Sequence, residues 1–164
     1  MEETITEFRP LRRRSRAISD DEARELLLNE KRGVLAVNGD NGYPFAIPLD
    51  YLYEPTENRI YFHGARQGHK VDALTKSDKV CFTVFGGDFH KDGEWAPYVR
   101  STVVFGRCRL ESDPTLTLEK IRALALRYYP SAEEVEAEIA REIRGAQLYV
   151  IEIEHLTGKQ IKEK

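Results

Sequence analysis

The sequence has few of the residues and runs that mark several large classes of protein. Its 164 residues include two cysteines, one methionine and one tryptophan. Both Cys81 and Cys108 lie in apolar segments, where cysteine usually serves as a small buried hydrophobe. No apolar run approaches the roughly 20 residues that a membrane-spanning helix needs, and the N-terminus lacks the apolar stretch of a secretory signal. We therefore expect a cytoplasmic protein that does not contact membranes.

An excess of charge of one sign is also absent. The chain has 25 Lys and Arg against 28 Asp and Glu, a formal net charge of −3, so nothing general predicts nucleic-acid binding. The exception is local, because five arginines and no acid lie within residues 9–16. We predict that residues 1–17 form a flexible basic arm, either simply solvated or in contact with a partner subunit or an anionic ligand. Residues 18–164 are predicted to form one domain.

The signature motifs of several enzyme classes are missing too. There is no phosphate-binding P-loop, no GxGxxG and no GxSxG, which disfavours these nucleotide sites and this form of nucleophilic triad. His63, His69, His90 and Cys81 are metal-ligand types, but their spacing matches no compact ligand pair such as CxxC or HxxxH. No metal site is therefore expected.

The pattern of apolar residues predicts a mainly β domain with helices. Ser19 and Glu22 fit a capping box that begins a helix ending near Gly33, and Ser131 with Glu134 fits a second one. Further helices are expected over 68–76, from Pro114 to Pro130, and from Ser131 to Gly145. Strands are expected over 33–38, 43–53, 59–65, 79–87, 99–111 and 148–153, before a polar tail. Six strands with tight turns favour antiparallel pairing in a small barrel, although periodicity alone also permits an α+β sandwich.

The predicted strand 43–53 contains prolines where a central strand would need N–H donors. Pro44 and Pro48 lie four residues apart, so their nitrogens face the same side of the strand. One interpretation is an edge strand protected against aggregation. The other is a strand whose remaining backbone groups, around Ile47 and Leu49, are free to contact a planar polar ligand.

The stretch YFHGARQGHKVDAL, residues 61–74, gathers basic and small residues at a strand-to-helix corner. Gly64, Ala65 and Gly68 would let a ligand approach the backbone. A helix beginning near Gly68 would direct its first N–H groups at an anion, with further contacts from side chains nearby. The residues that would supply these are Arg66, His69 and Lys70. A phosphate site, a metal site and a solvated turn all remain open from these residues alone.

Four segments of the chain resemble the FMN-binding split-barrel proteins related to pyridoxamine 5′-phosphate oxidase, in particular the branch of the nitroimidazole-resistance proteins. They are ISDDEARELLLNEKRGVLAV, GYPFAIPLDYLYE, IYFHGARQGHKVDAL with KVCFTVFG, and RSTVVFGRCRLE with IEIEHLTGKQI. Together they cover roughly residues 17–162 in the order found in that family. The resemblance implies a six-stranded antiparallel split barrel and a homodimer with two FMN molecules at the subunit interface.

The resemblance also assigns roles to residues. It implies that Ile47, Pro48 and Leu49 line the isoalloxazine ring, and that the corner His63-Gly64-Ala65 and Gly68-His69-Lys70 holds the ribityl phosphate. It places Ser101 with Arg100 and Thr102 at the cofactor near the dimer seam. We also expect Trp95 and Tyr98, in the predicted loop 88–98, to cover the ring from either subunit.

One departure from the family pattern limits the function that can be carried over. The arginine-rich C-terminal segment that grips a second phosphate in pyridoxamine 5′-phosphate oxidases has no counterpart, because the chain ends in HLTGKQIKEK. We therefore expect an FMN-dependent oxidoreductase that reduces a small molecule with electrons from a reduced nicotinamide. The alternatives are an FMN-binding or stress-related protein without turnover, and a related barrel that holds haem or a deazaflavin.

Overall fold

The computed structural model describes residues 8–163, without the side chain of Asp88. The helices are α1 (Asp20–Asn29), α2 (His69–Lys76), α3 (Pro114–Leu126) and α4 (Ala132–Glu142), with short 3-10 turns η1 (Arg14–Arg16) and η2 (Asp40–Gly42). The strands are β1 (Arg32–Asn38), β2 (Pro44–Asp50), β3 (Leu52–Glu54), β4 (Arg59–Gly64), β5 (Lys79–Phe89), β6 (Tyr98–Leu110) and β7 (Gln147–Lys162).

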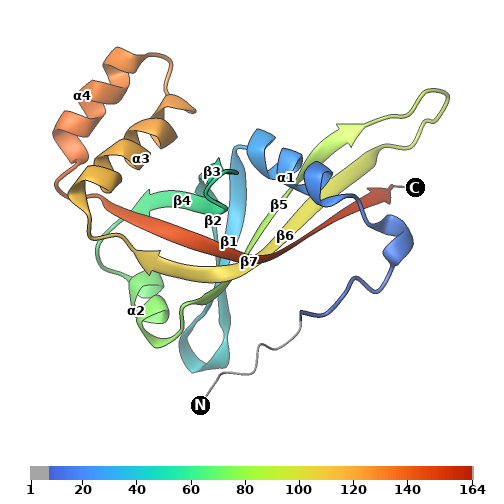
Figure 1. The fold of residues 1–164 in the computed structure, drawn as a ribbon, viewed down its shortest axis with the longest axis horizontal. Coiled ribbons are helices and arrows are strands. Elements are labelled where there is room, and N and C mark those ends of the chain that lie inside the picture. The colour runs from blue at the N-terminus through green and yellow to red at the C-terminus, as the bar shows by residue number, and fades with distance from the viewer. Residues whose placement is uncertain (1–7, 164) are drawn as a thin grey trace.

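All neighbouring strands pair antiparallel in one sheet of order β2-β1-β5-β6-β7-β4-β3. β2 and β3 lie at opposite edges of this order, yet only Tyr51 separates them in the chain. The sheet must therefore curl until its two edges approach each other, which gives an incomplete barrel. Figure 1 shows α1 beside the long strands β5 to β7 and the α3–α4 hairpin at one end of the sheet. The expected mainly β, α+β split-barrel architecture is confirmed.

The described residues form seven strands and not the predicted six, because the expected strand 43–53 breaks at Tyr51. The backbone N–H of Tyr51 donates to the Tyr128 hydroxyl (3.1 Å), and its carbonyl accepts from Tyr128 and from the Arg127 guanidinium. The Tyr51 hydroxyl donates to the Leu27 carbonyl at 2.5 Å. Since these bonds occupy the Tyr51 backbone, the residue ends β2 and redirects the chain into β3.

The predicted polar tail after Ile153 is wrong, because β7 continues to Lys162 in register with β6. The register shifts at Glu154, where an extra residue forms a β-bulge. On the inner face of the sheet, buried positions consequently change from Tyr149 and Ile151 before the bulge to Leu156 and Gly158 after it. This change of phase interrupts the alternation by which a strand is recognised in a sequence.

Two apolar clusters hold these elements together. The larger one packs α1 against the inner face of the sheet, around Leu27, Leu35 and Phe82. The smaller one packs the α3–α4 hairpin against β4 and β7, around Ile121 and Leu148. The Ser19–Glu22 capping box that begins α1 forms as predicted, whereas at α4 only the bond from the Glu134 N–H to the Ser131 hydroxyl forms. None of the described helices is long and apolar enough to cross a bilayer.

A buried lysine anchors α3 to the β3–β4 turn. Lys120 is 6% exposed, and its Nζ lies 2.9 Å from Glu57 and 3.7 Å from Glu54. The same Nζ lies 4.9 Å from the centre of the Tyr61 ring. Burial alone would lower the pKa of Lys120, but the hydrogen bond with Glu57 and the charge of Glu54 outweigh it and raise the pKa.

Removing this anchor should destabilise the fold. Lys120→Ala leaves two half-buried carboxylates without their cation, so we expect the free energy of unfolding to fall by about 3 kcal/mol. Urea unfolding measures this. Arg122→Ala on the same helix removes only an exposed pair with Glu136, and should cost less than about 1 kcal/mol. Equal effects of the two substitutions would contradict the anchoring role.

Candidate functional site

The corner between β4 and α2 is open and built for close approach of a ligand. β4 ends at Gly64, and Gly68 is the N-cap of α2 with φ +134°, a conformation that favours glycine. Within residues 8–163, apart from Gly68 and its two chain neighbours, no atom lies within 4 Å of the position that a Cβ on Gly68 would occupy. The Tyr149 hydroxyl donates to the Ala65 carbonyl at 2.5 Å, which fixes the chain just after β4. The predicted helix start at this corner is therefore present.

Lys70 is the cation that the fold places inside this corner. Its Nζ lies 4.6 Å from the centre of the Tyr149 ring and 5.3 Å from that of Phe62, and these two rings stack on each other. The Nζ also lies 2.8 Å from the position of a Cβ on Gly64. Burial lowers the pKa of Lys70. No ion pair joins it to another residue among those the structure describes, so an anion at this corner would supply the missing counter-charge.

The other two predicted phosphate ligands are placed differently. The His69 ring stacks on Phe45 at 4.0 Å, and its Nε2 lies 3.7 Å from Asp40. This side chain therefore packs α2 against the β1–β2 turn. Arg66 is exposed and makes no ion pair within residues 8–163, which leaves it free to turn toward an anion. Of the three basic side chains, Lys70 alone is held in the corner by the surrounding protein.

His63 lies at the end of β4 beside the end of β2. His63 is exposed, yet desolvation by the surrounding protein, followed by the charge of Lys70, lowers the pKa of its imidazole, while Asp50 opposes this shift. This direction favours the uncharged imidazole, which can donate one hydrogen bond and accept another. Asp50, His63, Gly64 and Ala65 line one cavity of about 540 Å³ together with α3 and α4.

β2 is an edge strand, as its prolines predict. The Gly39 N–H donates to the Tyr43 carbonyl (2.9 Å), which sets the alternation along the strand. Ile47 and Leu49 therefore direct their backbone groups to β1, opposite Leu35 and Gly33. The expectation that the backbone groups of Ile47 and Leu49 are free is therefore wrong.

The free backbone groups of β2 belong instead to the even-numbered residues. Pro44, Ala46 and Pro48 face the open edge, where the missing proline N–H groups cost no sheet hydrogen bond. The Ala46 N–H is the donor that remains between the two prolines, and it is flanked by their carbonyl groups. Sequence reasoning missed Ala46, although the proline spacing marks it.

The third group of predicted residues lies on β6, far from this corner. His63 pairs with Leu148 and Ser101 pairs with Lys159, so eleven positions of β7 separate them. At about 3.3 Å per residue this is roughly 35 Å, well beyond the length of one flavin mononucleotide. Along β7, therefore, one flavin is too short to extend from the corner to Ser101 of the same chain.

The neighbours of Ser101 point to the opposite face of the sheet. The Thr102 hydroxyl is buried and donates to the Ala23 carbonyl at 2.8 Å. Arg100 pairs with Glu22 at 3.0 Å and donates to Gln160 at 2.9 Å. These two side chains therefore join β6 to α1 and β7, and only the Ser101 side chain of this group faces away from the core.

The face of the sheet that carries Ser101 is apolar and uncovered over part of its area. We call it the outer sheet face. Phe85, directly opposite Ser101, is 68% exposed, and Val34 and Phe105 are more than one third exposed. Its remaining members on β1, β5 and β6, by alternation and register, are Ala36, Cys81, Thr83 and Val103. An apolar strip of this kind is typical of an interface.

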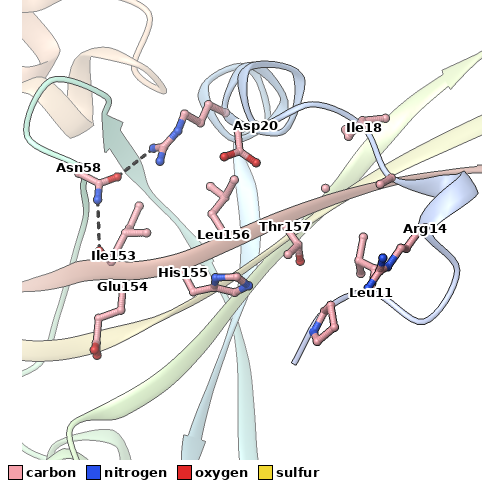
Figure 2. A pocket seen from close by; sticks show the side chains of 14 residues that line it. Leu11, Arg14, Ile18, Asp20, Asn58, Ile153, Glu154, His155, Leu156 and Thr157 are labelled. Carbon is pink, nitrogen blue, oxygen red and sulfur yellow. Dashed lines mark hydrogen bonds between the residues drawn. The ribbon is translucent and has the colours of Figure 1, made fainter. Parts of the chain in front are cut away.

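Residues 8–17 of the predicted arm lie along β7, and residues 1–7 fall outside the described part of the chain. Phe8 stacks on His155 at 4.6 Å, and Ala17 forms a bridge to Lys159. Figure 2 shows Leu11 and Arg14 beside the β7 residues of a second cavity, of about 500 Å³. None of the residues predicted to bind the cofactor lines this cavity.

The remaining candidate residues are the metal-ligand types, the cysteines, and the two aromatic residues of the predicted loop 88–98. Within the described residues no three His, Cys, Asp or Glu side chains gather as a metal site would require. Burial raises the pKa of the Cys108 thiol to about 12, so it is not a thiolate nucleophile.

Of the two aromatic residues, Tyr98 is buried, stacks on Phe89 and donates to Glu94 at 2.5 Å. Trp95, by contrast, is 80% exposed.

Solved structures of similar fold agree with this architecture. A Bacteroides thetaiotaomicron protein assigned to 5-nitroimidazole antibiotic resistance has a TM-score of 0.71 at 16% identity, covering 88% of this chain and 85% of that one. A conserved hypothetical protein from Mycobacterium tuberculosis has a TM-score of 0.76 at 16% identity, covering 92% and 89%. An FAD-binding protein from Mesorhizobium loti has a TM-score of 0.67 at 22% identity, covering 89% and 97%.

Comparison by sequence gives the family itself. A search of curated proteins finds no match. The family model described as pyridoxamine 5′-phosphate oxidase matches residues 19–160, which run from the cap of α1 nearly to the end of β7. The chain therefore belongs to the pyridoxamine 5′-phosphate oxidase family.

Proposed function

We propose that the protein binds FMN and acts as a homodimeric oxidoreductase that reduces a small molecule with electrons from a reduced nicotinamide. The observation that carries the proposal is Lys70 at the start of α2, a half-buried ammonium that has no counter-charge among the described residues. A phosphate at the helix N-terminus would supply that charge. Similarity to an FAD-binding protein supports a flavin, and one enclosed cation suits the single phosphate of FMN.

The other residues of the site have defined roles in this proposal. Lys70, with the first N–H groups of α2, holds the phosphate, and Arg66 adds charge from the surface. The open edge of β2 offers the Ala46 N–H and the neighbouring carbonyls to the rim of the ring system. Neutral His63 is placed to donate a hydrogen bond on the substrate side. When bound, the flavin supplies the hydride and electron chemistry, and the chain supplies orientation and shelter from water.

The homodimer is supported by the position of Ser101. Because Ser101 lies about 35 Å along the sheet from the corner of its own chain, it can reach a cofactor at that corner only from a second copy. The outer sheet face, with the exposed ring of Phe85, offers the apolar area for such a pairing. Two equivalent sites, each completed by the partner, follow from two-fold symmetry.

A visible spectrum under anaerobic conditions tests turnover. Protein loaded with FMN should show oxidised flavin absorbance that bleaches when a reduced nicotinamide is added and returns when oxygen is admitted. Flavin that stays oxidised would overturn the oxidoreductase proposal and leave a flavin-binding role. A haem absorption band in the purified protein would contradict the flavin assignment itself.

A further inference from the structure

The cavity beside His63 has the size of a small-molecule site. Its volume of about 540 Å³ falls within the range of roughly 300–1,000 Å³ typical of ligand pockets. The end of β4 forms one wall, and apolar side chains of α3 and α4 form the other, among them Ile121, Leu124 and Ile139. Figure 1 shows the α3–α4 hairpin standing at the end of the sheet that carries β4.

Side-chain hydrogen bonds hold the α3–α4 hairpin in place at the end of the sheet. Arg127, just after α3, donates to the carbonyl of Glu30 at 2.9 Å and to that of Leu28 at 3.2 Å. Tyr128, which lines the cavity, donates to the carbonyl of Tyr51 at 2.9 Å. These bonds join the end of α3 to the α1–β1 connection and to the β2–β3 break. The cavity is consequently part of the fold and does not depend on a ligand to open it.

Among the residues that the structure describes, the cavity is lined by acidic side chains and by no lysine or arginine. The carboxylates are those of Asp50, Glu138 and Glu142. The arginines that pair with Asp50 and Glu138 are Arg32 and Arg141, which are 76% and 69% exposed and lie outside the lining. Within the described residues Glu142 has no ion pair. An anion entering the cavity would therefore meet like charge on an apolar background.

We propose that this cavity binds a small apolar molecule that bears a protonated amine. The apolar part packs between Ile121 and Ile139, and the ammonium pairs with Glu142 at the end of α4. Because His63 and Ala65 also line the cavity, its occupant lies beside the corner assigned to FMN, and this makes a cationic apolar amine the substrate class. That last step rests on the proposed function, whereas binding in the cavity does not.

Two probes of equal aromatic size and opposite charge test the proposal. Isothermal titration calorimetry with 2-phenylethylamine and with 3-phenylpropionate, on protein with and without FMN, should show binding of the amine and at least about tenfold weaker binding of the acid. Glu142→Lys should weaken binding of the amine about tenfold and strengthen binding of the acid. The substitution places a cation at the C-terminal end of α4, where the helix dipole tolerates it.

A matched control separates the local charge from the net charge. Glu25→Lys on α1 makes the same change in net charge on an exposed helix position outside the cavity, and should leave both affinities unchanged. Equal affinity for amine and acid, absence of amine binding, or an equal loss in Glu25→Lys would overturn the proposal. If the amine binds while flavin absorbance is never retained, the cavity assignment stands and the FMN proposal fails.

Discussion

Lys70→Glu should abolish retention of FMN through purification and weaken its equilibrium binding by at least about 100-fold. A charge-assisted hydrogen bond contributes about 1.5–3 kcal/mol, and each 1.4 kcal/mol is a factor of about ten in affinity. The substitution removes this bond and also places a like charge against the phosphate. Quenching of free flavin fluorescence by added protein measures the dissociation constant directly.

Lys76→Glu is the matched control for this experiment. It makes the same charge change at the other end of α2, on a side chain that is 72% exposed and 3.7 Å from Asp40. FMN affinity should stay within about threefold of the parent, because an exposed pair contributes little. If both variants, or neither, lose the flavin, Lys70 is not the phosphate ligand.

Lys70 should also make the flavin-free protein less stable. Burial lowers the pKa of Lys70, so the unfolded chain binds this proton more tightly than the folded one. The folding free energy lost by burying charged Lys70 is largest at pH values below the lowered pKa. This loss disappears as the pH rises toward the ordinary pKa of lysine. Lys70→Met should therefore raise the melting temperature of the flavin-free protein at neutral pH, which differential scanning calorimetry measures. A cost to stability that serves binding is expected at a functional position.

Phe85→Glu should separate the dimer and release the flavin together. The parent side chain is already 68% exposed within one chain, so the substitution leaves the fold intact. In a two-fold interface it appears twice and introduces two unpaired charges into an apolar contact. We expect the dimer dissociation constant to rise at least about 100-fold, because one uncompensated buried charge costs about 3 kcal/mol or more.

Analytical ultracentrifugation across a range of concentrations measures this dissociation constant. Leu126→Glu provides the control, since Leu126 is an apolar residue of α3 that is 51% exposed and lies away from the outer sheet face. It should leave both the dimer and the flavin content unchanged. A Phe85→Glu variant that is dimeric and fully loaded with FMN would place the interface elsewhere on the molecule.

Local patterns in the sequence were enough to predict much of the fold. The capping box at Ser19 begins α1 as expected, and alternation located each strand that has one buried face. The missed features depend on residues far apart in the chain. Tyr51 breaks its strand because Arg127 and Tyr128 bind its backbone. The bulge at Glu154 changes which residues of the inner face of β7 are buried, so the alternation that would predict its second half as a strand is lost.

In the candidate site, too, the sequence predicts what depends on local residues and misses what depends on residues far apart in the chain. The spacing of Pro44 and Pro48 correctly indicates an edge strand, because the absence of an N–H is a local property. Which basic residue of the corner is enclosed cannot be read locally, since Lys70 is held between α2 and the ring of Tyr149 on β7. His69, directly before Lys70 in the same motif, stacks instead on Phe45. Tertiary packing thus separates residues that the sequence presents as equivalent.

The central claim is that two copies of the chain together hold FMN at the β4–α2 corner. Size-exclusion chromatography with light scattering and simultaneous flavin absorbance, on protein reconstituted with excess FMN, tests it most directly. We predict a single species with the mass of two chains that carries two FMN molecules. A monomer that carries one FMN, or a dimer that carries none, would contradict it.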